Sequence, residues 1–558
     1  MIISAMYAIL AILIGIILYG LVYRYYVKWF DKSVMMVDPK RATPAHVYMD
    51  GIEYFPSNKY VLFGFQWKSI AALGPVLGPI LAIQWGWLPA FLWILFGTIF
   101  IGWLHDYGSM MVSVRSEGAS FGPITYEVIS PRARTILLWY ILWYIVLILS
   151  SFTNVVGGLL NTVPQSPVPL LVTTVIGVIA GYLTYKLKVN IVITTVIAII
   201  VMYLGVYLGL MIPIKIDLGV WTIDFWMWVV LIFCFLGAVL PIWVFIQPIN
   251  YLSFYLVYFG IIGMIIGTFS GISYASPTVT TFFDPAVTFS GPLWPMLFVT
   301  VACGAISGWH SLIGSSITSK QLDNEADGSM VAGGAMIAEG IMALVALTTA
   351  AILAPDVAIG NIKAGKTAAN FVTGGSTLLN VIGIPLDFGK AYATIMLVIL
   401  AITIMHIGLR ITRLVLSELA GPRLGGILRN KYLAAIIVMI IVWIVTSPKT
   451  GASFAYLWPT FGGANQLMAG LALMIITLWL LREKRRTIFT SIPMFFMIIT
   501  TISALIYLSY SGITGYIAAP EKIGLGIAAV INIILIILAI VMVSEGYRAY
   551  RRIKLATK

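Results

Sequence analysis

Residues 71–82 read Ala-Ala-Leu-Gly-Pro-Val-Leu-Gly-Pro-Ile-Leu-Ala and place two pairs, Gly74-Pro75 and Gly78-Pro79, inside an apolar run. Proline removes a backbone donor and disfavours helical backbone at the residue before it. Backbone that is not helical survives at membrane depth only where protein buries it or where it lines a water-filled cavity. The stretch therefore predicts an interrupted membrane helix beside a polar cavity.

A second irregular stretch, residues 303–316, reads CGAISGWHSLIGSS. Its small residues suit close helix packing, and its hydroxyls suit coordination of a ligand. A tight helix–helix seam would need the same glycines and serines, so both interpretations stay open. The candidate binding residues in this stretch are Cys303, Gly304, Ser307, Gly308, Trp309, His310 and Ser311.

The composition around these stretches is that of a membrane protein. Of 558 residues, 61% are hydrophobic and only 9% are charged, whereas soluble domains carry about 25% charged residues. This excludes a water-soluble enzyme, a disordered chain and a nucleic-acid binder. The two cysteines, Cys234 and Cys303, lie in apolar runs and offer neither a disulfide framework nor metal-ligand spacing. We expect an all-α polytopic protein whose partner is the lipid bilayer.

A helix that crosses the bilayer needs about 20 apolar residues, and the sequence contains fifteen such runs. Residues 367–386 are apolar but rich in Gly, Thr and Asn, which makes them a candidate re-entrant segment. The loops are too short for a soluble domain. The predicted spans lie near residues 2–23, 61–82, 87–112, 134–158, 168–185, 189–212, 225–247, 251–272, 293–319, 329–353, 391–409, 432–448, 454–481, 488–510 and 523–546.

The net charge of +13 reports topology. With the N-terminus outside, alternate loops place 26 of the 33 Lys and Arg residues on the cytoplasmic side and six outside, as the positive-inside rule requires. The same alternation makes the C-terminus cytoplasmic. The first span lacks a basic leading region, so we expect a retained helix rather than a cleaved signal.

Two acidic residues, Asp106 and Glu339, lie within predicted spans. Ionisable groups are costly there and usually mark function. Glu339 is a candidate ligand for a coupling ion or a proton carrier, or else a structural hydrogen-bonding group. Asp106 is a candidate gating carboxylate, or else pairs with Arg115 or Lys320 at the interface.

Other polar residues within spans allow two interpretations each. For Lys68 we favour snorkelling to the cytoplasmic surface over attraction of an anionic substrate. His310 is either a relay or a structural histidine. Asn465 and Gln466 need buried partners, so they join helices or line a cavity.

The two irregular stretches lie in spans of opposite direction. A pair of interrupted helices in corresponding positions of two halves points to a transporter's binding site, where half-helix N-termini attract carboxylates. We therefore expect both stretches to line a site at the middle of the membrane.

Several motifs together carry a family resemblance, and all of them lie between residues 43 and 481. At these residues the chain resembles the carbon starvation protein A (CstA) family of prokaryotic transporters. The motifs are Thr43-Pro44-Ala45, Pro56-Ser57-Asn58-Lys59, Gly74-Pro75-Val76-Leu77-Gly78-Pro79, Asp106 with Ser113 and Arg115, Leu240-Pro241-Ile242-Trp243 with Gln247-Pro248, Ala302 to Gly308 with His310, Gly334-Ala335-Met336 with Glu339, Arg410 with Arg413 and Glu418, and Phe461-Gly462 with Asn465-Gln466.

The resemblance implies a secondary transporter in a prokaryotic plasma membrane, importing peptides or, alternatively, pyruvate with a proton or Na⁺. It also implies the LeuT-like fold of two inverted repeats, and no cofactor. We expect one membrane domain over residues 1–558, with an extra N-terminal helix, a first repeat, an inserted hairpin, a second repeat and C-terminal helices at 2–23, 61–212, 225–272, 293–481 and 488–546.

Three positions depart from the family pattern, with Gln66, Asn250 and His406 where relatives carry histidine, aspartate and an Asp-Thr pair. Charge is lost at sites suited to ion coupling or substrate contact, so the substrate cannot simply be copied from relatives. A channel would need a filter loop, for which only 367–386 is a candidate. An intramembrane enzyme would need a metal or nucleophile set, and a sensor would need a signalling domain.

Overall fold

The computed structural model describes residues 7–420, 426, 428–450 and 454–556, and these residues form helices and no strand. Twelve helices are long and apolar enough to cross a membrane. A bent pair, α4 (Lys59–Ile70) and α5 (Gly74–Ala82), passes the same test jointly. The predicted all-helical membrane class is confirmed.

The other two predicted spans have shorter helices. The span at 293–319 is divided between α14 (Leu293–Thr300) and α15 (Gly308–Ser316), and the span at 432–448 is the 16-residue α21 (Lys431–Thr446). The count of fifteen and the inverted repeats stay predictions, and the first residues of the span at 2–23 lie outside the described part.

The remaining helices follow in chain order. Those of the first half are α1 (Ala8–Leu21), α2 (Lys28–Phe30), α3 (Pro44–Val47), α6 (Trp87–Gly97), α7 (Trp103–Val114), α8 (Phe121–Val128), α9 (Pro131–Thr162), α10 (Pro167–Gly181), α11 (Ile191–Met211), α12 (Thr222–Val239) and α13 (Ile246–Thr268). Those of the second half are α16 (Ala335–Ala351), α17 (Pro355–Lys363), α18 (Thr367–Val381), α19 (Leu386–Leu419), α22 (Phe454–Arg482), α23 (Ile488–Ala518) and α24 (Ile523–Ala556).

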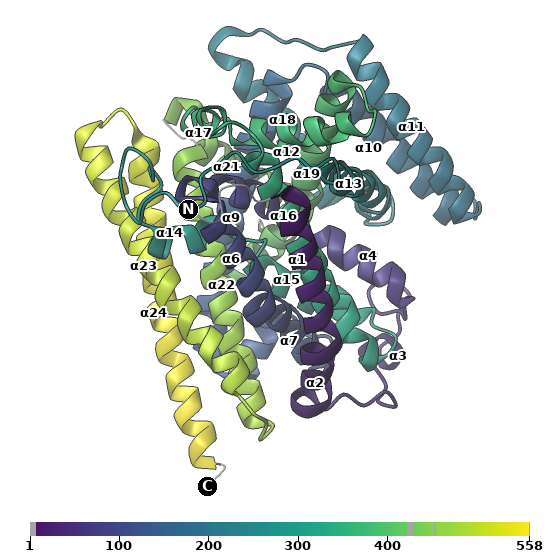
Figure 1. Cartoon of the computed structure of the whole chain (residues 1–558). Helices are drawn as coiled ribbons and strands as arrows, with labels where there is room; N and C mark the ends of the chain where they lie inside the picture. The colour runs from purple at the N-terminus through teal and green to yellow at the C-terminus, as the bar shows by residue number, and fades with distance from the viewer. Residues whose placement is uncertain (1–6, 421–425, 427, 451–453, 557–558) are drawn as a thin grey trace.

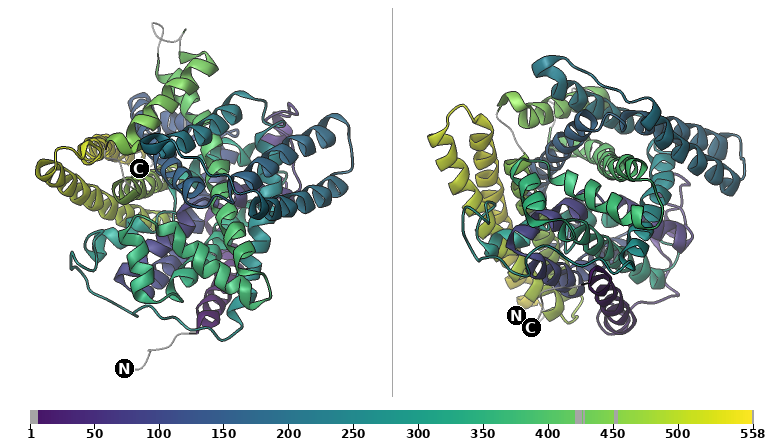
Figure 2. Two further views of the ribbon diagram at one scale, coloured as in Figure 1. Left: turned by 90° about the horizontal axis from the view of Figure 1, so that it is seen from above. Right: turned by 45° about the horizontal axis from the view of Figure 1, so that its top comes forward.

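The helices form a buried bundle with two peripheral pairs. Figures 1 and 2 show α23 and α24 along one edge and α10 and α11 at the opposite edge. Central helices such as α19 and α22 bury nearly their whole circumference, whereas α11 and α24 expose apolar side chains such as Ile200 and Ile537. A helix that is apolar all round and exposed on one side suits a lipid boundary.

Side-chain caps fix several helix starts. Asn58, Asn190 and Asn430 accept hydrogen bonds from the first backbone N–H groups of α4, α11 and α21, and Ser130 does so for α9. A short polar side chain at this position satisfies a donor that the helix itself leaves free. These polar residues between apolar runs therefore set where the helices begin.

The candidate re-entrant segment at 367–386 contains α18, a buried 15-residue helix that packs on α13, α16 and α19. Two π-helical segments precede the helices that carry the buried acids. They are Thr98–Gly102 before α7 and Ser329–Gly334 before α16. Such segments often lie at functional sites.

Candidate functional site

The first interruption lies between α4 and α5, which are bent by 49°. Its unwound residues are 71–73, just before the first Gly-Pro pair. The prediction that the pairs themselves are not helical is wrong, because Pro75 occupies the first turn of α5 and Pro79 lies inside that helix. A first-turn proline is well tolerated, since its missing N–H would have no partner there.

The second interruption separates α14 from α15 and leaves residues 301–307 outside any helix. Helix α22 supplies the missing partners for the backbone carbonyls. Gln466 Nε2 donates to the carbonyls of Phe298 at 2.7 Å and Val301 at 2.9 Å. Asn465 Nδ2 donates to the carbonyl of Ala302 at 3.0 Å.

Asn465 also accepts hydrogen bonds on its side-chain oxygen. Its donors are Ser307 Oγ at 3.1 Å, the backbone N–H of Trp309 at 3.2 Å and the Tyr144 hydroxyl at 2.5 Å. The oxygen and the nitrogen of the Asn465 amide therefore fix the unwound segment in one conformation. The sequence predicted that Asn465 needs partners, but nothing in it pointed to Tyr144.

The two interruptions pack directly on one another. A Cβ on Gly78 would lie 2.7 Å from the carbonyl oxygen of Thr300, so only glycine permits this approach. Trp309 Nε1 donates to the carbonyl of Ser69 at the end of α4, at 2.8 Å. The structure thus brings together the two stretches that the sequence singled out.

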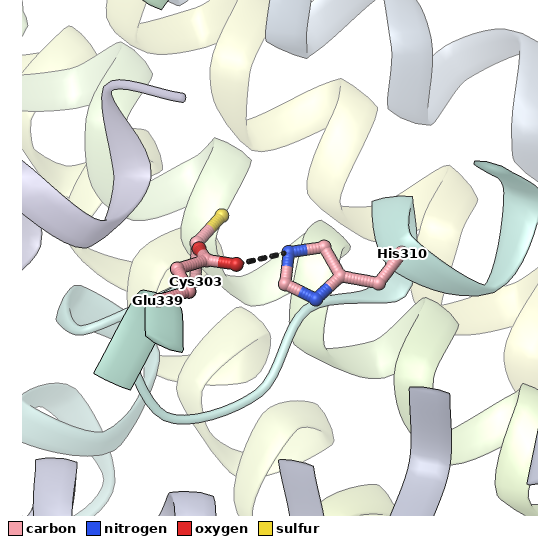
Figure 3. Close-up of side chains that lie close together, drawn as sticks. All are labelled: Cys303, His310 and Glu339. Atoms are coloured by element: carbon pink, nitrogen blue, oxygen red, sulfur yellow. Dashed lines mark ion pairs between the residues drawn. The ribbon is translucent and has the colours of Figure 1, made fainter. Parts of the chain in front are cut away.

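Beside the interruptions lies a row of four ionisable side chains, which we call the acid–imidazole chain: His105, Asp106, His310 and Glu339. Nδ1 of His105 and Nδ1 of His310 each lie 2.8 Å from one oxygen of the Asp106 carboxylate. His310 Nε2 lies 3.2 Å from a Glu339 oxygen (Figure 3). All four side chains are fully buried.

The acid–imidazole chain links three helices, because its members lie on α7, α15 and α16. The imidazole of His310 stands between two carboxylates, so a proton on that ring offsets their charge. The alternative pairing of Asp106 with Arg115 or Lys320 is wrong. Arg115 pairs with Glu325 at 2.7 Å, and Lys320 pairs with Glu53 at 2.6 Å.

A thiol joins this chain. Ligand atoms of Cys303, His310 and Glu339 lie within 4.8 Å of one another, and the three side chains are buried. A thiolate, a neutral imidazole and a carboxylate could together hold a divalent cation such as Zn²⁺, at the cost of releasing protons. Here Cys303 Sγ lies at hydrogen-bond distance from Ser307 Oγ, at 3.4 Å, and from Asn465 Nδ2, at 3.3 Å.

Two further candidate residues, Ser311 and Gly304, form hydrogen bonds next to the second interruption. The Ser311 hydroxyl donates to the carbonyl of Gly308 inside α15. The carbonyl of Gly304 accepts a hydrogen bond from Thr98 Oγ1 at 3.1 Å. Thr98 begins the π-helical segment before α7, a contact that no sequence pattern indicated.

Lys68 does not snorkel, which corrects the sequence-based preference. Its side chain is 1% exposed, and its ammonium donates to Thr403 Oγ1 on α19 at 2.6 Å. The path to the surface is closed because Lys68 and its neighbour Trp67 contact Thr403 on α19 and Phe254 on α13. Thr403 is a partner that the sequence did not identify.

A cavity of about 220 Å³ lies next to the second interruption. It is lined by α14, α22, α23 and α24, and its lining includes Thr300, Trp458 and Tyr507. Thr300 is the last residue of α14, so the cavity reaches the start of the unwound segment.

Comparisons with known proteins agree with the motifs. The family model described as "Carbon starvation protein CstA" matches residues 7–368 and 357–504. The peptide transporter CstA of Escherichia coli K12 is 31% identical, over 90% of this chain and 81% of that protein. The corresponding Bacillus subtilis peptide transporter is 29% identical, over 98% of this chain and 97% of that one.

A third relative carries a different name. The pyruvate/proton symporter BtsT of E. coli K12 is 34% identical, over 63% of this chain and 50% of that protein. Among solved structures, an Eremococcus coleocola manganese transporter covers 90% of this chain at 14% identity and a TM-score of 0.45, which is too weak a likeness to carry an argument. With a family model over most of its length and relatives named as transporters, the chain belongs to the carbon starvation protein CstA family of membrane transporters.

Proposed function

We propose that the protein is a secondary active transporter that imports a small carboxylate-bearing nutrient, with peptides as the first candidate. The observation that carries the proposal is the meeting of two interrupted helices beside the buried acid–imidazole chain. Interrupted helices offer backbone groups to a substrate within the membrane, and buried charges are typical of ion-coupled transport. The relatives named peptide transporters support this substrate class.

The acid–imidazole chain takes the driving cation, a proton or Na⁺. Glu339 and Asp106 act as the coupling carboxylates, with His310 between them. Both oxygens of Glu339 lack a hydrogen bond, so its carboxylate keeps its capacity to accept a proton or a cation. Asn465 and Gln466 keep the unwound segment in register while the ion binds.

The substrate binds where the two interruptions meet, within reach of the 220 Å³ cavity on the α14 side. Helix α15 begins where the second interruption ends, and helix N-termini favour negative charge. The residues we assign to the binding region are Gly74, Pro75, Gly78, Pro79, Cys303, Gly304, Ser307, Gly308, Trp309, His310 and Ser311.

The repeats of this transporter run from 61 to 212 and from 293 to 481, with 225–272 as an inserted hairpin. Each repeat then begins with an interrupted helix, as in transporters built from inverted halves. The N-terminus lies outside and the C-terminus in the cytoplasm, in line with the distribution of Lys and Arg.

The alternative substrate is pyruvate, taken up with a proton. The similarity to the relative named as a pyruvate/proton symporter favours it. Pyruvate and a peptide both present a carboxylate, so the same site geometry serves either.

The test is uptake of radiolabelled dialanine and pyruvate into proteoliposomes, with an imposed pH or Na⁺ gradient and with none. We expect gradient-driven accumulation of one substrate, lost in Glu339→Gln. The matched control is Glu545→Gln, which alters a buried carboxylate on the peripheral helix α24 that pairs with Arg548. Equilibration without accumulation would indicate a channel or facilitator, and no uptake of either compound would overturn the proposed substrate class.

A further inference from the structure

Lys68 is a buried amine that has no acidic partner among the residues the structure describes. None of the carboxylates in the described part of the chain lies within ion-pair distance of its ammonium. Of its three N–H donors, one bonds to the neutral hydroxyl of Thr403, which itself donates to the carbonyl of Ile399. A buried charge without a partner is costly and needs an explanation.

Polar residues continue along one face of α19, which we call the basic face because it ends in two arginines: Thr403, His406, Arg410 and Arg413. Their spacing of three or four residues places them on the same side of the helix. His406 itself packs against the rings of Phe233 and Phe245. The basic face therefore leads from Lys68 to the end of α19 predicted to be cytoplasmic.

The basic face has no acidic partner among the residues that the structure describes. Arg410 makes a single hydrogen bond, to the carbonyl of Leu240 at 3.4 Å. Glu53, whose charge reaches Arg410, is itself paired with Lys320. Both ring nitrogens of His406 and the Nε of Arg413 are buried without a hydrogen bond.

Helix α13 closes the other side of this region. Phe245, just before α13, packs on the ring of His406, and the Tyr392 hydroxyl donates to the carbonyl of Leu256. Asn250 lies between Phe245 and Leu256 in the chain, on the first turns of α13. Both polar atoms of its buried amide lack a partner.

We propose that Lys68 binds the carboxylate of the transported nutrient and that the basic face of α19 guides this carboxylate toward the cytoplasm. The proposal rests on the proposed function and assigns the anion-binding residue within it. A carboxylate at Lys68 would accept hydrogen bonds from the free ammonium N–H groups. Charge-assisted hydrogen bonds of this kind are about twice as strong as neutral ones.

This assignment separates binding of the driving cation from binding of the substrate carboxylate. The acid–imidazole chain has no unpaired positive charge to offer to an anion, since Asp106 and Glu339 flank the His310 ring. Lys68, Arg410 and Arg413 offer basic groups and pair with no acid in the described part of the chain. The carboxylate of the substrate and the driving cation are thereby assigned to different charged groups, Lys68 on α4 and the carboxylates of α7 and α16.

The test compares a carboxylate substrate with its neutral amide in the full-length protein. Uptake of dialanine and of dialanine amide is measured in proteoliposomes for the wild type, Lys68→Met and Lys68→Gln. The glutamine variant can still donate to Thr403, so it guards against misfolding. The control is Lys59→Met on the same helix, whose ammonium pairs with Asp327 at 3.2 Å.

We expect the wild type to prefer dialanine and both Lys68 variants to lose that preference, with KM for dialanine raised about ten- to hundredfold, the worth of a charge-assisted hydrogen bond. Lys59→Met should keep both the preference and KM. An unchanged KM and preference in Lys68→Gln would overturn the assignment while leaving the transporter proposal standing. Failure of the wild type to take up any carboxylate-bearing nutrient would instead overturn the proposed function, and with it this assignment.

Discussion

The acid–imidazole chain and the basic face of α19 are both buried and polar, yet they treat charge in opposite ways. In the chain, each imidazole lies against a carboxylate, so imidazoles and carboxylates alternate. On the basic face, Arg410 and Arg413 have no acidic partner among the described residues, and neither does Lys68 beside it. The two regions are therefore suited to different ligands. The carboxylates of the acid–imidazole chain can bind a cation, and Lys68 beside the basic face can bind an anion.

The largest expected effect is a loss of stability in the acid–imidazole chain. His310→Ala leaves Asp106 and Glu339 as two buried carboxylates with no cation between them. Breaking a buried charged network in this way costs about 3–5 kcal/mol, which we expect as a lower midpoint of thermal unfolding in detergent. The matched control is His406→Ala, which removes an equally buried imidazole that makes no hydrogen bond and should cost less. Equal losses for both variants would contradict the comparison.

The next effect concerns the amide that holds the interruption. Asn465→Ala leaves the carbonyl of Ala302 and the hydroxyls of Ser307 and Tyr144 without this hydrogen-bond partner. Each buried group left unsatisfied costs about 1–3 kcal/mol of stability. Uptake should fall together with thermal stability. Asn532→Ala on α24 is the control, because this buried amide makes one hydrogen bond, to Thr460. If both variants behave alike, the unwound segment does not depend on Asn465.

At Lys68 we expect the opposite change in stability. Lys68→Met removes a buried charge without stranding an acid, so we expect the substrate-free protein to gain about 1–2 kcal/mol of stability. The measurement is the same thermal midpoint, taken with and without dialanine. Wild type should be stabilised by dialanine and Lys68→Met should not. A destabilised Lys68→Met protein would mean that the ammonium has a structural role.

The smallest effect is at the outer end of the basic face. Arg410 is half-buried and makes one long hydrogen bond, to Leu240. Arg410→Gln should lower the uptake rate about twofold and flatten its dependence on ionic strength, since long-range steering by charge is screened by salt. Rates measured across a range of salt concentrations test this, and an unchanged salt dependence would remove Arg410 from the pathway.

The sequence predicted more of the fold than of the site. Apolar run length and the distribution of Lys and Arg suffice to define membrane helices, because each helix satisfies its own backbone. The breaks were also predictable to within a turn, since Gly-Pro pairs and a Gly-Ser stretch mark them. The exact position of the first break was not, because Pro75 and Pro79 were accommodated in α5 rather than before it.

Side-chain partners across helices could not be predicted. The sequence separates Lys68 from Thr403 by more than three hundred residues, and only tertiary packing decides that the path of Lys68 to the surface is closed. The same holds for Tyr144, whose bond to Asn465 has no pattern in the chain. The sequence identified Asp106, His310 and Glu339 one by one as polar groups within spans. That they contact one another depends on how α7, α15 and α16 pack.

The measurement that tests the account most directly compares exchange with accumulation in the same proteoliposomes. Labelled dialanine outside is exchanged against unlabelled dialanine inside, and separately accumulated under a pH or Na⁺ gradient. We predict that Glu339→Gln keeps exchange and loses accumulation, because the substrate still meets Lys68 while the coupling carboxylate is gone. Accumulation that persists in Glu339→Gln, or exchange that is lost with it, would contradict the division between the two regions.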